Sequence, residues 1–246
     1  MSDNLFGFST EAPTGTFLPI VKYDAKAGRM FRIDRVEGAN GYESVQEDIT
    51  DIFSALVDFE HIEVGWIDFA TGGAPSFVMT QRGKEFPKMP STTHKRGIRY
   101  LLKLSKACAE GRPPVREIAG TSRAFLATTE AIVGTYLAEK DQHPGLLPVL
   151  GFDGKPVPVK TGSGAKTSTN YHPRWKILGW APRGDLVHPD GNKALTGKEA
   201  YSDAPTNGRS APQTGSTRAE PPFEMDEPAT QKSARQKPAF DANDFG

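Results

Sequence analysis

The stretch from Lys155 to Arg183, KPVPVKTGSGAKTSTNYHPRWKILGWAPR, decides how the rest of the chain is interpreted. It holds six lysines and arginines, no acidic residue, and three large aromatic residues: Tyr171, Trp175 and Trp180. A single-stranded nucleic acid needs positive charge for its phosphates and flat rings for its bases, each stacked base contributing about 1–3 kcal/mol. Tryptophans on a strand also pack in protein cores, so both roles are open for these rings.

The alternation of a strand separates the two roles between Pro173 and Ala181. We expect Trp175 and Ile177 on a core face, and Trp180 on an opposite, binding face that it shares with two cations, Arg174 and Lys176. The preceding segment 161–169 has glycines before a Lys-Thr pair, as in a phosphate-binding loop. Ala165 and Lys160 stand where such a loop has glycine, so the segment predicts a basic hairpin tip instead.

The composition predicts one globular domain with tails. The chain has 246 residues, 37% of them hydrophobic, and a formal net charge of zero. The charge lies in blocks: residues 82–123 carry eleven bases against three acids, and residues 34–68 carry ten acids against one base. This asymmetry indicates a surface for a polyanion with an acidic surface opposite, although a charge run is also typical of any solvated face.

The cellular setting follows from cysteine and from apolar runs. Cys108 is the single cysteine, so no intramolecular disulfide forms and a reducing, cytoplasmic location is expected. The first residues lack the basic and apolar regions of a secretion signal, and no apolar run has the length of a membrane span. We therefore expect no membrane association.

Periodicity predicts a mainly β, α+β domain. Helices are expected over 43–59 and 122–140, the second capped by Ser122. A turn is expected at Asp153-Gly154, and residues 185–246 have the composition of a disordered tail. Strands are expected over 16–23, 29–36, 61–70, 74–80, 95–104, 146–151, 155–160 and 173–181.

Two of these strands carry specific expectations for their side chains. In 95–104, Tyr100 and its alternate neighbours should face the core, while Arg99 and Lys103 should form a cationic outer face. In the hairpin 61–80, Trp66 should belong to the core, and Phe69 and Phe77 should lie exposed at the tip.

A basic, aromatic-lined β domain followed by a polar tail that ends in acids and Phe245 resembles the single-stranded DNA-binding proteins of bacteria and bacteriophages. The resemblance implies an OB-like antiparallel barrel with helical insertions. It also implies an acidic tip that recruits replication or recombination enzymes, in the cytoplasm of a bacterial host if a phage encodes the chain. The bacterial tip usually ends in Pro-Phe, whereas this chain lacks the proline and adds Gly246.

The resulting hypothesis is a non-catalytic protein that binds single-stranded DNA without sequence preference in replication, recombination or repair. It divides the chain into a lead over 1–15, an OB-like domain over 16–184 and a tail over 185–246. The expected nucleic-acid-binding residues are Lys22, Tyr23, Arg29, Phe31, Arg32, Phe69, Phe77, Arg82, Lys84, Arg99, Lys103, Lys160, Lys166, Tyr171, Arg174, Lys176, Trp180 and Arg183. The expected partner-binding tail residues are Phe240, Asp241, Asp244 and Phe245.

Two alternatives remain open at this point. One is a nucleotide-dependent or nucleic-acid-processing enzyme that uses the loop Gly162–Thr169 and the acids near Asp48. The other is a structural protein whose basic face meets another protein. The five histidines are scattered and no serine has a nucleophile motif, so no catalytic residue, metal site or cofactor is expected.

Overall fold

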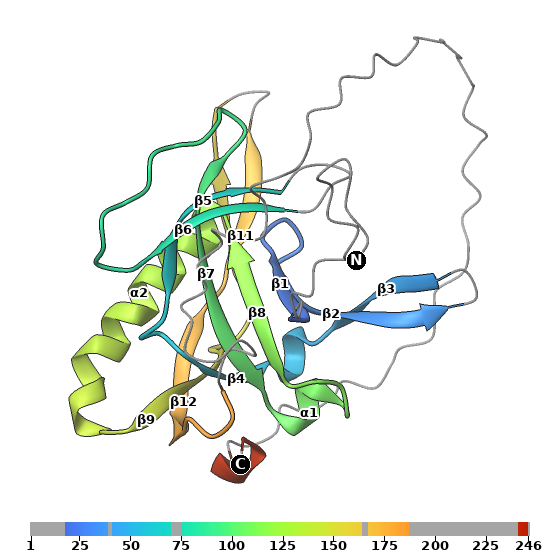
Figure 1. Cartoon of the computed structure of the whole chain (residues 1–246), viewed down its shortest axis with the longest axis vertical. Coiled ribbons are helices and arrows are strands. Elements are labelled where there is room, and N and C mark those ends of the chain that lie inside the picture. Colours follow the sequence, from blue (N-terminus) through green and yellow to red (C-terminus); the bar gives the residue numbers. More distant parts are fainter. Residues whose placement is uncertain (1–17, 39–40, 70–74, 164–166, 187–240, 246) are drawn as a thin grey trace, which may run out of the picture.

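The computed structural model describes residues 18–38, 41–69, 75–163, 167–186 and 241–245. Figure 1 shows a mainly β, α+β chain, as expected. The strands are β1 (Ile20–Asp24), β2 (Arg29–Gly38), β3 (Gly41–Asp48), β4 (Ser54–Val57), β5 (Glu63–Asp68), β6 (Ser76–Gln81), β7 (Lys95–Leu104), β8 (Val115–Gly120), β9 (Leu146–Phe152), β10 (Val157–Thr161), β11 (Ser168–His172) and β12 (Trp175–Pro182). The helices are α1 (Lys106–Ala109), α2 (Arg123–Glu139) and the 3₁₀ turns η1 (Thr50–Ile52), η2 (Lys140–Gln142) and η4 (Ala242–Asp244).

One open, mixed sheet of ten strands organises the domain. Its order is β12-β9-β4-β7-β8-β1-β2-β3, with β1 and β8 parallel and the other pairs antiparallel. The long strand β7 pairs with β8 along one edge and with both β4 and β5 along the other, so the sheet forks there. The sheet is not closed, and the expected OB-like barrel is not confirmed.

Strand β7 begins and ends where the alternation predicted. Tyr100, Leu102 and Leu104 are buried in the main core, as expected. The other face of β7 differs from the prediction, because Arg99 and Lys103 are only 8% exposed. That face is covered by other parts of the chain, so it is not an open cationic surface.

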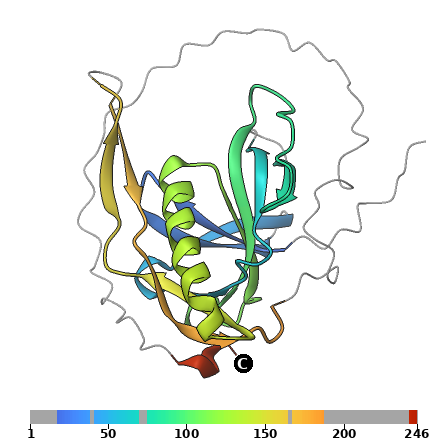
Figure 2. The same ribbon diagram turned by 90° about the vertical axis from the view of Figure 1, so that its left-hand side faces the viewer.

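Helix α2 covers the core face of the sheet. The side chain of Ser122 accepts a hydrogen bond from the backbone N–H of Phe125 at 3.2 Å, which confirms the predicted cap. Phe125, Ile132 and Tyr136 pack into the main core. Seen from its own side, α2 runs in front of the sheet with the β10–β11 hairpin on one side and β5–β6 on the other (Figure 2).

The helix predicted over 43–59 is wrong: this segment forms β3, η1 and β4. Asp48 ends β3, because its Oδ1 accepts from the backbone N–H and the hydroxyl of Thr50 at 3.0 and 2.6 Å. Strand β4 lies between β7 and β9, so Ala55, Leu56 and Val57 are all buried. A strand buried on both faces has no polar alternation, and its apolar run imitates helical spacing.

The basic, aromatic stretch from Lys155 to Arg183 forms the β10–β11 hairpin and β12. At Asp153-Gly154 the chain bends without reversing, because β9 pairs with β12 and β10 pairs with β11. The register of β12 shifts between Ile177 and Gly179, and this bulge moves Trp180 onto the face of Trp175 and Ile177, where all three pack against the main core. The separate binding face expected for Trp180 is therefore wrong.

A second apolar cluster lies on the sheet face away from α2. It contains Leu56, Leu101, Leu147, Val149, Ala181, Leu186 and Phe245. Two ends of the predicted tail, Leu186 and the segment 241–245, are thus packed on the domain, while residues 187–240 lie outside the described residues. No helix in the described part of the chain is long and apolar enough to cross a membrane.

Candidate nucleic-acid interface

Aromatic rings gather at one end of the sheet. We call this region the corner and define it as β5 with Phe69, β6, the following segment 82–94 and the first part of β7, residues 95–99. Phe69 is 49% exposed and Phe86 is 41% exposed. Phe69 meets Phe77 edge to face at 6.3 Å between ring centroids, and Trp66 meets Phe86 in the same way at 5.6 Å. The corner thus presents two ring pairs, one on each face of the β5–β6 hairpin.

Arginine side chains lie against both ring pairs. The guanidinium carbon of Arg96 lies 5.8 Å from the centroid of Trp66 and 5.5 Å from that of Phe86. The guanidinium of Arg99 lies 4.8 Å from the centroid of Phe77. These distances are those of cation–π contacts. Arg96 remains exposed, so its N–H groups can also meet a phosphate.

Further cations surround the rings. Exposed positions of the corner hold Arg82, Lys84, Lys88 and Lys95. Within the described residues none of these four forms an ion pair. Glu85 is the one acid that the sequence places between Arg82 and Arg96. The corner therefore combines unneutralised positive charge with accessible rings.

The segment 82–94 has no regular secondary structure, yet side chains fix it at two points. The indole N–H of Trp66 donates to the carbonyl of Pro87 at 2.8 Å. Near the other end, the hydroxyl of Thr93 donates to Asp68 at 2.6 Å, and the ring of His94 lies 3.2 Å from the hydroxyl of Ser76. The stretch between these anchors includes Met89, which is 53% exposed.

Of the residues expected to bind nucleic acid, five lie at the corner: Phe69, Phe77, Arg82, Lys84 and Arg99. Arg99 differs from the others because it is buried and donates to Glu63 at 2.7 and 2.8 Å. Burial raises the pKa of Glu63 to about 7, against the opposing effect of Arg99. Arg99 holds Phe77 in place and is not a free phosphate ligand.

A second group of the expected binding residues lies on the β10–β11 hairpin and at the start of β12. Lys160 and Lys176 are exposed, and Arg174 pairs with Asp153 at 2.7 Å. Tyr171 packs against Gly28, where an added Cβ would lie 2.9 Å from the tyrosine ring, and its backbone N–H donates to the carbonyl of Ala25 at 2.7 Å. Lys166 lies outside the described residues.

A third group lies on β1 and β2. Lys22 is exposed and stands opposite the half-buried Phe31 in the strand pair. Arg29 forms an ion pair with Asp48. Asp48 is therefore engaged by Arg29 and Thr50 and caps a turn, which gives it a structural role and no open catalytic one.

Three more of the expected residues, Tyr23, Arg32 and Lys103, are buried, which corrects the prediction for them. Tyr23 packs among Phe125, Phe152 and Trp175. Lys103 is buried beneath Phe245, because its ammonium donates to the carbonyl of that residue.

Arg32 is 5% exposed and belongs to a buried ionic cluster that joins β2, β8 and α1. It donates to Asp34 at 2.8 Å and to the carbonyl of Cys108 at 2.6 Å. Arg116 donates to the same Asp34 at 2.6 Å. Burial alone would raise the pKa of Asp34, but these hydrogen bonds hold it below its ordinary value. Arg32 therefore stabilises the fold.

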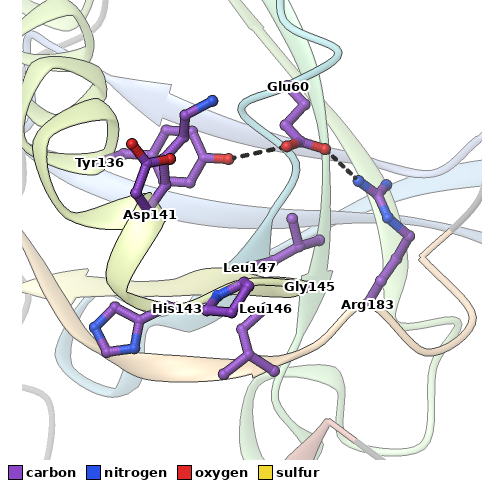
Figure 3. A pocket seen from close by; sticks show the side chains of 10 residues that line it. Glu60, Tyr136, Asp141, His143, Gly145, Leu146, Leu147 and Arg183 are labelled. Atoms are coloured by element: carbon purple, nitrogen blue, oxygen red, sulfur yellow. Dashed lines mark hydrogen bonds and ion pairs between the residues drawn. The ribbon is translucent and has the colours of Figure 1, made fainter.

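Figure 3 shows a cavity of about 310 Å³ at the C-terminal end of α2, lined in part by Glu60, Tyr136 and Arg183. Arg183 donates to Asp58 at 2.5 Å and to Glu60 at 3.1 Å, and Tyr136 donates to Glu60 at 3.4 Å. Asp58, Glu60 and His61 have ligand atoms within 4.8 Å of one another. Since Arg183 already neutralises both carboxylates, this cluster ties the end of β12 to the 58–61 turn.

The sequence did not single out five corner residues: Trp66, Phe86, Lys88, Lys95 and Arg96. Trp66 has the same strand parity as the core residues Ile62 and Val64, and that pattern predicted burial. Phe86 lies in a proline-containing segment with no period. The signal that could have found them was the run of basic residues around Phe86 between Arg82 and Arg96.

The expected partner-binding residues of the tail differ in their exposure. Phe240 lies outside the described residues. Asp241 is exposed and caps η4, Asp244 is half-buried, and Phe245 is 2% exposed.

Comparisons with protein-family models, with curated proteins and with solved structures find no match for this chain.

Proposed function

We propose that this protein binds single-stranded DNA without sequence preference, and that the corner is its principal contact surface. The observation that carries the proposal is the set formed by the exposed Phe86 and Arg96 with the half-buried Trp66, surrounded by lysines that have no acidic partner among the described residues. Rings offer stacking surfaces to any base, and lysines meet any phosphate, so this chemistry is independent of sequence.

The same arrangement favours a single strand over a duplex. The bases of a duplex stack on one another and present only their edges, so an exposed phenylalanine such as Phe86 gains nothing from them. The unstacked bases of a single strand can lie flat on Phe86 while their phosphates reach Lys84 or Lys88. Arg96 contributes to both interactions. Its planar guanidinium lies against two rings and extends the stacking surface, and its exposed N–H groups can bind a phosphate.

We include an OB-like arrangement of the strands in this proposal, although the ten-stranded sheet itself is open. Strand β1 and the β1–β2 turn meet β11 through three hydrogen bonds: from the Tyr171 N–H to the carbonyl of Ala25, from the Tyr23 hydroxyl to the carbonyl of Tyr171 at 3.0 Å, and from the ammonium of Lys26 to the hydroxyl of Ser168. These contacts join the β1–β2 turn of the ten-stranded sheet to the separate two-stranded sheet formed by β10 and β11. The exposed Lys160 and Lys176 then extend the cationic surface beyond the corner.

The wider role that we propose is non-catalytic protection of single-stranded DNA in replication, recombination or repair, in the cytoplasm of a bacterial host. The tail would recruit replication or recombination enzymes through Phe240, Asp241, Asp244 and Phe245. The chemistry that supports recruitment is the combination of acids and aromatic rings at the end of a polar segment.

The test is fluorescence anisotropy of a labelled oligothymidine titrated with the full-length protein at several salt concentrations. We expect the logarithm of the association constant to fall linearly with the logarithm of the salt concentration, with a slope of about −0.7 for each contacted phosphate. Unlabelled single strands should compete far better than the matching duplex. Binding that ignores salt, or a duplex that competes as well as the single strand, would refute the proposal.

A further inference from the structure

The C-terminal tip occupies an apolar socket on its own domain. We define the socket by Leu56, Leu101, Leu147, Val149, Ala181 and Leu186, which come from β4, β7, β9, β12 and the residues after β12. Phe245 completes this cluster and is 2% exposed. In Figure 1 the turn η4 lies beside the end of β12 and near α1. A ring buried to this degree is bound and does not merely rest on the surface.

Two lysines hold the backbone of the tip. The ammonium of Lys103 donates to the carbonyl of Phe245 at 2.6 Å and pairs with Asp185 at 2.5 Å. The ammonium of Lys106 donates to the carbonyl of Asn243 at 2.9 Å. Both contacts are to main-chain carbonyls, so recognition of Phe245 does not require it to be the terminal residue.

The tip also has its own local structure, which presents the ring. The carboxylate of Asp241 accepts from the backbone N–H of Asn243 at 2.9 Å, and the N–H of Phe245 donates to the carbonyl of Ala242 at 3.3 Å. The side chain of Asp241 thus shapes the turn, while the ring of Phe245 and two carbonyls contact the domain. A pocket of about 340 Å³ beside the tip is lined by Lys106, Arg112 and Asp244.

The socket is remote from the corner. Strand β7 connects them, with Lys95 and Arg96 at the corner and Lys103 at the socket. At about 3.3 Å per residue, the seven steps from Arg96 to Lys103 span roughly 23 Å. DNA bound at the corner and a tip bound in the socket are therefore not direct competitors.

We propose that this socket is a peptide-binding site for a short acidic segment containing phenylalanine, that the chain's own tip fills it reversibly, and that this docking withholds Phe245 from any other receptor. One buried ring and two lysine hydrogen bonds make a small interface, so the bound state persists because the segment 187–240 tethers the tip to the domain. A partner that captures the tip must first draw Phe245 out of the socket. This inference holds whether or not the corner binds DNA.

The experiment starts from the folded full-length chain, with a specific protease site inserted in the segment 187–240 and a fluorophore on the released tip fragment. After cleavage, the fragment should stay with the domain in anisotropy measurements at high protein concentration and dissociate on dilution. Excess synthetic peptide Phe240–Gly246 should displace it. The uncleaved chain should bind that free peptide at least about tenfold more weakly than the cleaved, diluted domain, because its socket is filled.

Two variants identify the contacts. Phe245→Ala in the fragment should abolish retention, and Lys106→Ala in the domain should weaken it about threefold to tenfold, as expected for the loss of one solvent-exposed hydrogen bond. Lys84→Ala, which removes an equally exposed lysine at the corner, should leave retention unchanged. Immediate release of the wild-type fragment from a domain that keeps its circular dichroism spectrum would overturn the proposal, as would equal retention of the Phe245→Ala fragment.

Discussion

The corner and the base of the β10–β11 hairpin carry the same kinds of residues, aromatic rings interleaved with lysines and arginines, and they use them differently. At the base, Trp175 stacks on Phe152 at 4.9 Å and Trp180 stacks on His143 at 4.3 Å. At the corner, Phe86 and Phe69 remain about half exposed. The difference comes from the surroundings: α2 covers the face that carries both tryptophans, whereas β6 and the segment 82–94 border solvent. Composition alone therefore does not show which rings are free to bind.

The largest effect should separate the two regions by stability. Trp175→Ala removes a ring packed against Phe53, Phe152 and Phe125, so it should lower the free energy of unfolding by about 3–5 kcal/mol. Trp66→Ala should cost about 1–2 kcal/mol, since it loses one hydrogen bond to Pro87 and the contact of a half-buried ring with Phe86. Urea denaturation measures both. A larger loss for Trp66→Ala than for Trp175→Ala would reverse the comparison.

A second prediction concerns Trp180, which the sequence pattern placed on a binding face. Because the half-buried ring contacts Tyr136 and His143, Trp180→Ala should lower the free energy of unfolding by about 1–2 kcal/mol. The affinity of the folded variant for single-stranded DNA should stay unchanged in the anisotropy assay. Normal stability combined with a large loss of affinity would restore the role that the alternation predicted.

The pH dependence of stability should report on the buried side of the corner. The folded protein holds the proton of Glu63 up to a pKa of about 7, whereas the unfolded chain releases it near the ordinary value. The folded state then binds more protons between these values, so stability falls as pH rises from about 4.5 to 7. The carboxyls of Asp34, Asp48 and Asp58 have lowered pKa values and titrate below this window.

Glu63→Gln tests this dependence. The amide stays neutral, so the melting temperature of the variant should change less between about pH 5 and pH 8 than that of the wild type, which should fall by a few degrees. Arg99→Lys is a useful companion because it keeps the charge beside Glu63 and removes the paired hydrogen bonds. Identical pH profiles for wild type and Glu63→Gln would contradict the prediction.

The smallest effect should come from a single exposed lysine. Lys88→Ala removes one phosphate contact at the corner and should weaken DNA binding severalfold, with a salt slope lower by about 0.7. Lys106→Ala removes the same charge at the socket and should leave both quantities unchanged. Equal losses for both variants would show that net charge, and not the corner, governs binding.

Much of the fold could be predicted from local patterns. The alternation from Lys95 to Leu104 and the cap at Ser122 both gave the correct elements, because each depends on a few neighbouring residues. The segment 43–59 could not be predicted correctly, since β4 is buried on both faces only through its pairing with β7 and β9. Nor could the bulge after Ile177, which exchanges the faces of β12 and removes Trp180 from the surface.

The candidate site could likewise be predicted only where it depends on neighbouring residues. Phe69, Phe77, Arg82 and Lys84 were identified from their positions in a hairpin tip and a basic loop, and the structure brings them to the corner. Charge patterns do not show ion pairing, so Arg32 and Lys103 were counted as free although other segments cover them. The docking of Phe245 joins residues 142 positions apart, a contact that no local pattern contains.

The most direct test of the central claim compares two double variants in the same single-stranded DNA titration. Phe86→Ala/Arg96→Ala removes a stacking ring and its cation from the corner, and Leu137→Ala/Arg112→Ala removes an exposed apolar residue and an exposed arginine elsewhere. Losing one stacked base should weaken binding by about 1–3 kcal/mol, or roughly fivefold to 150-fold, for the corner variant alone. Wild-type affinity in the folded corner variant, or an equal loss in the control, would contradict the account.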